Sequence, residues 1–80
     1  MPEELKDAKR AVGLKQSRKA LKENAAVKAF VAHDAEDRIR LSLLELCAEA
    51  GVPADQTYSM EELGHACGIE VGAAVAVILK

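Results

Sequence analysis

Apolar residues recur at helical spacing in several parts of the chain, and each of these parts predicts a helix. The longest predicted helix covers residues 36–50 and ends before Gly51. Glu36 and Arg40 are four residues apart, a spacing that predicts a favourable ion pair on this helix. The positions predicted to face the core are Ile39, Leu43, Leu46, Cys47 and Ala50.

Three shorter helices are predicted around this one. The first begins at Pro2, which suits the first turn of a helix. The second covers residues 15–23, with Asn24 as its stop, and the third covers residues 60–67. The apolar side of the first helix is formed by Leu5, Ala8 and Val12.

Short apolar runs between these helices predict strands. Residues 27–32 and residues 73–79 are rich in aliphatic side chains, and the second run is typical of a central strand. A weaker strand is predicted at 56–59, and a brief strand or turn at 12–13. Helices that alternate with strands predict a single α/β domain over residues 1–80. We expect a three-layer α/β/α sandwich around a small four-stranded mixed sheet.

The composition narrows the range of functions. Phe30 and Tyr58 are the only aromatic residues, which excludes a platform that stacks successive bases on rings. The charged start of the chain, from Glu3 onward, does not resemble a signal peptide. The apolar run at 71–79 is too short to span a bilayer, so no membrane partner is expected. We therefore expect a cytoplasmic protein whose thiols stay reduced.

Charge is distributed unevenly along the chain. The formal net charge is −2, but residues 9–28 hold seven basic residues and one acid. From Leu41 onward Lys80 is the one basic residue, against six acids. A local basic stripe is what a phosphate backbone would meet, although a solvated helix face has the same pattern.

Residues 13–22 combine features that bind anions. A glycine ahead of a helix allows close backbone approach, and free N–H groups at a helix start favour negative charge. Lysine and glutamine side chains can also hydrogen-bond base edges. The candidate residues here are Gly13, Lys15, Gln16, Arg18, Lys19 and Lys22.

Other candidate chemistry is weak. Cys47, His65 and Cys67 lack the spacing of a metal site, and we expect both cysteines to be buried. His33 is expected in a loop without a paired nucleophile. We find no phosphate loop and no pair of catalytic carboxylates, so neither an enzyme nor a cofactor is expected. The glycines at 64, 68 and 72 are expected to serve turns and close packing.

Three segments resemble the L7Ae ribosomal-protein superfamily, whose members bind RNA kink-turns. Residues 13–19 resemble the Gly-Thr-Asn-Glu-x-x-Lys signature of that family. Residues 33–36 resemble its Asp-Ala-Glu turn, and residues 63–74 are similar to its C-terminal motif. The likeness extends from about Lys6 to Lys80 and is greatest with short bacterial members, whose first motif reads Gly-Thr-Lys-Gln.

The resemblance implies a role for each matching residue. Lys15 and Gln16 would read the guanines of tandem sheared G·A pairs, and Lys19 would approach the RNA from the same helix. Glu36 would contact an extruded nucleotide, while a loop after the last helix would pack on the bulged nucleotides. The loop residues are Ile69, Glu70 and Val71.

Some positions depart from the family pattern. Leu14 replaces a common threonine, residues 60–62 replace a basic run, and Asp37 replaces a frequent proline. These changes predict weaker binding than in archaeal relatives. The expected partner is a kink-turn in ribosomal RNA or a riboswitch, bound by a monomer, with the ribosome as one setting. The acidic C-terminal half leaves a protein–protein adaptor on the same fold as the alternative.

Overall fold

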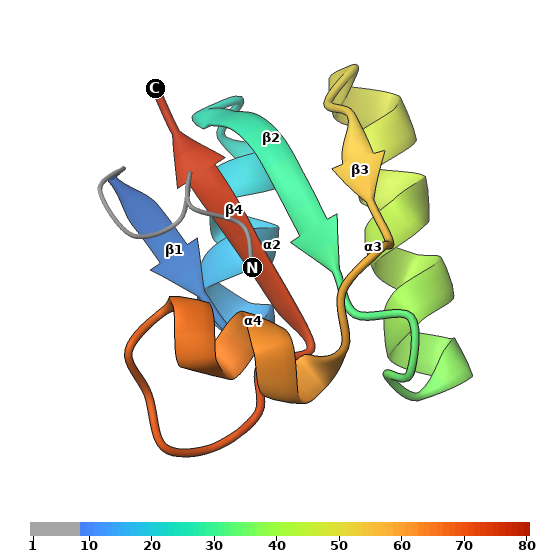
Figure 1. Ribbon diagram of the computed structural model, residues 1–80. Coiled ribbons are helices and arrows are strands. Elements are labelled where there is room, and N and C mark those ends of the chain that lie inside the picture. Colours follow the sequence, from blue (N-terminus) through green and yellow to red (C-terminus); the bar gives the residue numbers. More distant parts are fainter. Residues whose placement is uncertain (1–8) are drawn as a thin grey trace.

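The computed structural model describes residues 9–80, and Figure 1 shows how their helices and strands are arranged. In chain order the elements are β1 (Arg10–Val12), α2 (Leu14–Lys22), β2 (Ala26–Val31), α3 (Asp37–Ala50), β3 (Ala54–Asp55), α4 (Met60–Ala66) and β4 (Val75–Leu79). The helix predicted from Pro2 lies mostly outside the described residues. Its extension to Val12 is wrong, because residues 10–12 pair with β4 as a strand.

The four strands form one mixed sheet with the order β1-β4-β2-β3. β4 is antiparallel to both of its neighbours, and β3 is parallel to β2. The prediction of a central strand at the C-terminus is therefore confirmed. The strand predicted at 56–59 is wrong, since β3 ends at Asp55. There the side-chain oxygen of Asp55 accepts the N–H of Thr57 at 2.8 Å, which turns the chain out of the sheet.

Helices cover both faces of the sheet, as the predicted α/β/α sandwich requires (Figure 1). α2 and α3 pack on one face around Leu21, Leu43 and Val77. α4 packs on the other face around Phe30 and Leu63. On α3, Leu43 and Cys47 are fully buried, whereas the other three positions predicted to face the core are partly buried.

The three helices end in left-handed residues that fold the chain back toward the sheet. Asn24 (φ 57°), Gly51 (φ 68°) and Gly68 (φ 74°) follow α2, α3 and α4. After each helix, a backbone N–H donates a hydrogen bond to the carbonyl oxygen five residues earlier, as in a Schellman motif. The stop predicted at Asn24 is confirmed.

The ion pair predicted between Glu36 and Arg40 is wrong. Arg40 Nη2 pairs instead with Asp37 Oδ1 at 2.9 Å. Glu36 is the N-cap of α3 and has an extended backbone (φ −52°, ψ 136°). Because this conformation is not helical, the i,i+4 geometry does not apply to its side chain.

Candidate nucleic-acid interface

Three segments that are far apart in the sequence meet at one end of the sheet. β1 and β2 both finish at this end, and β4 begins there because it is antiparallel to both. Two hydrogen bonds join the segments: Gly13 N–H donates to Val75 O at 3.0 Å, and Ala32 N–H donates to Ala74 O at 2.9 Å. Figure 1 shows the starts of α2 and α3 and the α4–β4 loop along its lower side.

The start of α2 leaves backbone donors without partners in the helix. Gly13 precedes it with φ 91° and ψ 165°, a conformation that strongly favours glycine. The first helical bond runs from Ser17 N–H to Gly13 O (3.0 Å), so the amides of residues 14–16 precede the helical ladder. Among residues 9–80 no side chain caps this end, and the first turn of α2 contains no acid. This arrangement can bind an anion.

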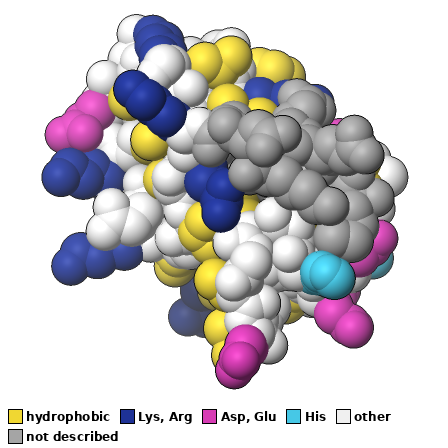
Figure 2. Space-filling view, turned by 60° about the vertical axis from the view of Figure 1, so that its left-hand side comes forward, with side chains coloured by type: hydrophobic (Ala, Val, Ile, Leu, Met, Phe, Trp, Pro, Cys, Tyr) yellow, Lys and Arg dark blue, Asp and Glu magenta, His cyan; other side chains and the backbone are white. Residues whose placement is uncertain are grey.

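The polar side of α2 faces solvent. Ser17, Ala20 and Leu21 are buried and fix the orientation of the helix. Figure 2 shows lysine and arginine side chains gathered toward the left of its view, on the side to which α2 turns. The exposed residues of α2 that the sequence singled out are Lys15, Gln16, Lys19 and Lys22.

Arg18 differs from these neighbours. Its side chain is half-buried, and its Nη2 donates to Ser42 Oγ of α3 at 3.0 Å. This contact ties α2 to α3. Helix packing is therefore the role that the geometry gives Arg18, and its predicted contact with phosphate stays a prediction.

The loop between α4 and β4, residues 68–74, presents aliphatic side chains to solvent. Val71 is 71% exposed and Ile69 is 38% exposed, with Glu70 exposed between them. Two bonds to α4 hold the loop backbone: Ile69 N–H donates to Gly64 O, and Ala73 N–H donates to Met60 O, both at 3.0 Å. The loop is therefore an exposed apolar surface whose backbone is held in place by α4.

Gly64 lets this loop lie directly against α4. A Cβ atom built on Gly64 would overlap the carbonyl oxygen of Val71. The contact is thus between two backbones, and no side-chain rotation could relieve the overlap. The expectation that this glycine serves close packing is confirmed.

The turn between β2 and α3 is attached to the same unit. Asp34 Oδ1 accepts the N–H of Met60 at 2.8 Å, which fixes the start of α4. Glu36 is exposed at the start of α3. A surface groove of about 640 Å³ runs between α4 and the loop. Its lining residues are Asp34, Met60, Glu61, His65, Gly68, Ile69, Glu70, Val71 and Gly72.

The start of α4 also carries a complete capping box. Ser59 Oγ accepts the N–H of Glu62 at 3.1 Å, and Glu62 Oε1 accepts the N–H of Ser59 at 2.9 Å. The backbone bond from Ser59, followed by the bond from its hydroxyl, holds the pKa of Glu62 below its ordinary value. α4 and the loop that it supports are therefore anchored at the helix start.

Replacing Glu62 with glutamine should reduce the loss of folding stability that accompanies a fall in pH. The pKa of Glu62 is lower in the folded state, so its contribution is present above the unfolded pKa and is lost as pH falls through the folded pKa. Glutamine still closes the capping box but does not titrate. Urea denaturation at pH 7 and at about pH 3.5 should show a smaller loss of stability in Glu62→Gln. An equal loss in both proteins would contradict this assignment.

The remaining histidine, cysteine and acidic side chains form no metal-binding group within residues 9–80. No three of the histidine, cysteine and acidic residues described there are grouped to hold a metal ion. Cys47 and Cys67 are buried free thiols, and burial raises the pKa of each. His33 and His65 are exposed. In the same part of the chain, no helix is long and apolar enough to cross a membrane.

Sequence reasoning missed two residues that support the loop. Asp34 holds the start of α4, and Arg10 Nη2 donates to Cys67 O at its end, at 3.0 Å. Arg10 and Cys67 are 57 positions apart, so no local pattern links them. Asp34 belongs to the turn that resembles the family, but that likeness carries no indication of the bond to Met60.

Comparisons with known proteins agree with this fold. The model of the ribosomal protein L7Ae/L30e/S12e/Gadd45 family matches residues 1–80. An RNA-binding protein from Geobacillus sp. (strain WCH70) is 43% identical over 76 residues, covering 95% of this chain and 93% of that protein. The large ribosomal subunit protein eL8 of Halobacterium salinarum is 37% identical over 68 residues, covering 84% of this chain and 57% of that protein.

A solved structure has a similar architecture. The 15.5 kD RNA-binding protein of Giardia lamblia superposes with a TM-score of 0.87 at 30% sequence identity. The match covers 98% of this chain and 69% of that one. The α/β sandwich described above is therefore the fold of that protein as well.

Proposed function

The chain belongs to the ribosomal protein L7Ae/L30e/S12e/Gadd45 family, and we propose that it binds RNA kink-turns and holds them in the bent form. One observation carries the proposal. The uncapped start of α2 and the exposed aliphatic loop lie at the same end of the sheet. They are joined through the hydrogen bond from Gly13 N–H to Val75 O. Relatives named as RNA-binding proteins support an RNA partner.

The start of α2 enters the widened major groove beside the tandem G·A pairs. Lys15 and Gln16 are exposed there and donate to the O6 and N7 edge of guanine. The free amides and the positive end of the helix dipole favour the nearby phosphates. This half of the surface recognises paired bases.

The 68–74 loop covers nucleotides that have left the stack. Ile69 and Val71 offer an apolar surface to an unstacked base, in place of the aromatic rings that the chain lacks. Glu70 is exposed between these two residues and Glu36 is exposed at the start of α3, and both accept hydrogen bonds from bases. Because these contacts form with the kinked RNA alone, binding shifts the RNA toward that state by the difference in affinity.

Raising the salt concentration should weaken binding, because exposed lysines of α2 neutralise phosphates. Lys15, Lys19 and Lys22 are exposed along α2, whereas Arg18 is engaged with Ser42. With roughly three to four phosphates neutralised, affinity should fall as about the third power of salt concentration. Titrations at several salt concentrations measure this slope. A slope near zero would remove the phosphates from the proposal.

A bending assay tests the proposal directly. The protein is titrated into a kink-turn duplex with a dye on each arm, and into a matched duplex without the tandem G·A pairs. We expect tight binding and increased energy transfer with the intact motif alone. Equal binding to both duplexes would reduce the basic stripe to nonspecific attraction, and no binding at all would favour the protein–protein adaptor.

The setting of this activity is part of the same proposal. We expect the RNA to be a kink-turn of ribosomal RNA or of a riboswitch, bound by one copy of the chain in the cytoplasm. The relationship to eL8 favours association with the ribosome. No step in this function needs a cofactor or catalysis.

A further inference from the structure

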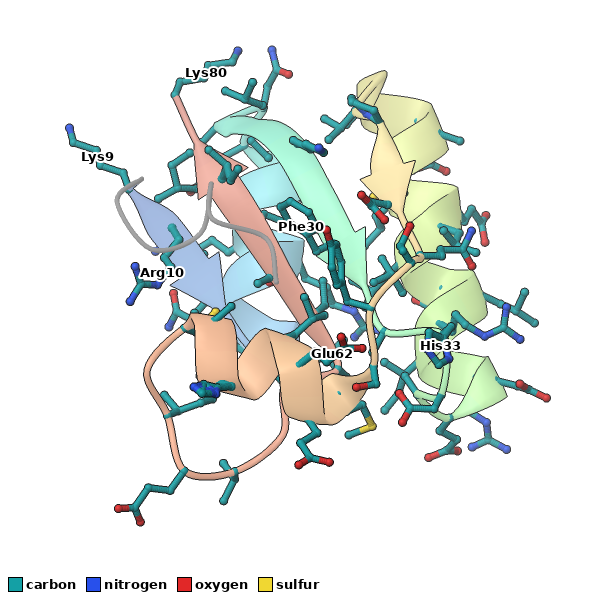
Figure 3. All side chains as sticks on the ribbon, in the orientation of Figure 1. Lys9, Arg10, Phe30, His33, Glu62 and Lys80 are labelled. Atoms are coloured by element: carbon teal, nitrogen blue, oxygen red, sulfur yellow. The ribbon has the colours of Figure 1, made fainter. Side chains whose placement is uncertain are left out.

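Arg10 joins β1 to the end of α4. Its Nη2 donates to the carbonyl oxygen of Cys67 at 3.0 Å, in a partly buried contact. Cys67 is the C-cap of α4, where carbonyl groups have no partner within the helix. A cation at this point also complements the negative end of the helix dipole. Figure 3 shows Arg10 on β1, beside α4.

This contact lies between the two halves of the proposed RNA surface. Three residues after Arg10, the same strand leads to Gly13 and the start of α2. One residue after Cys67, the chain enters the 68–74 loop at Gly68. β1 therefore continues directly along the chain into the start of α2. Through the side-chain hydrogen bond of Arg10, it is also joined to Cys67, just before the loop.

We infer that Arg10 is a positioning residue that sets the place of the 68–74 loop relative to the start of α2. The inference rests on the proposed function, in which these two halves contact different parts of one RNA. The G·A pairs and the bulged nucleotides of a kink-turn are held at a fixed spacing. A loop already held at that spacing avoids the ordering cost that a mobile loop incurs on binding.

Two other roles for Arg10 make different predictions. If Arg10 contacted phosphate directly, its loss would weaken binding to every RNA duplex, and lower salt would partly compensate. If it merely stabilised the fold, its loss would lower the melting temperature without changing the choice between RNAs. Positioning predicts instead a loss confined to RNA that contains both the G·A pairs and the bulge.

The test compares Arg10→Met with Lys9→Met. Both variants lose one positive charge and keep an unbranched apolar stem. Lys9, however, is exposed, and it lies at the end of β1 opposite to the start of α2 (Figure 3). Each is titrated against an intact kink-turn and against RNA with the G·A pairs but no bulge. Hydrogen exchange of the Gly68 and Ile69 amides is followed by NMR without RNA.

We expect Arg10→Met to bind the intact kink-turn about tenfold more weakly, and Lys9→Met about twofold more weakly. On the RNA without the bulge, both variants should change equally. Exchange at Ile69, whose N–H bonds to Gly64, should be faster in Arg10→Met alone. Arg10→Lys, which restores a cationic donor, should recover most of the affinity and the slow exchange.

Several outcomes would overturn the inference. Equal losses in Arg10→Met and Lys9→Met would do so, as would an equal loss on both RNAs. If the wild-type protein fails to distinguish the two RNAs, kink-turn recognition is wrong, and the exchange data decide alone whether Arg10 holds the loop. Should Arg10→Met unfold, Arg10→Gln is measured by the same criteria.

Discussion

Replacing Lys15 and Gln16 together by alanine will lower affinity for an intact kink-turn by about a hundredfold. Both side chains are exposed at the start of α2, where the proposal places the guanine edges. A well-formed pairing between a side chain and a base contributes about 1–3 kcal/mol of discrimination, so losing two has a large effect. Titration of the dye-labelled kink-turn with the double variant measures the change.

The control for this experiment is Lys80→Ala. It removes the same charge from an exposed site after β4, at the end of the sheet opposite to the start of α2 (Figure 3). Its affinity should drop no more than about twofold. The double variant should remain as stable as the wild type, because alanine favours helix and the lost lysine opposed the dipole. Unchanged RNA affinity in the double variant would show that α2 does not read bases.

Replacing Gly64 by alanine will disrupt the loop and destabilise the protein. The new methyl group overlaps the carbonyl oxygen of Val71, so α4 and the 68–74 loop must separate. Overpacking of this kind costs about 1–3 kcal/mol, and because the neighbour is backbone we expect a value near the upper end. For a domain of this size, that corresponds to a melting temperature lower by roughly 10–20 °C.

Thermal unfolding and kink-turn titration together test this prediction. His65→Ala is the control, since His65 is exposed on the same helix and its truncation should change stability by less than about 0.5 kcal/mol. Gly64→Ala should also lose the preference for RNA with a bulge, because the loop covers the bulged nucleotides. A Gly64→Ala protein with wild-type stability and preference would show that the loop can move at no cost.

The two experiments examine the two halves of the surface separately. The Lys15 and Gln16 variant keeps the loop, and the Gly64 variant keeps the start of α2. If both lose kink-turn affinity while duplex binding persists, RNA recognition needs both halves. If neither does, the adaptor alternative becomes the better account.

Much of this protein was predictable from short-range pattern. Helical periodicity located α2, α3 and α4 to within one or two residues, because the period of a helix is visible within the segment itself. The aliphatic run at the C-terminus predicted the central strand, and glycine or asparagine predicted the helix stops. Residue type and family resemblance likewise identified residues 13–19 and 69–71 as candidates.

Other features depended on partners far along the chain. Residues 10–12 are a strand because β4 pairs with them, although their own pattern continued a helix. Arg18 turned toward Ser42, and Arg10 toward Cys67, across 24 and 57 positions. Asp55 ended β3 early with a bond to Thr57 that hydrophobic pattern does not encode.

The sequence by itself determined which segments are helical, which are apolar and which carry the candidate chemistry. The tertiary structure alone decided that the start of α2, the 33–36 turn and the 68–74 loop lie at the same end of the sheet. The physical reason is the strand order: β4 lies between β1 and β2 and is antiparallel to both, so its beginning meets both of their ends. Side-chain periodicity describes one element at a time, and hydrogen bonds between strands determine which elements become neighbours.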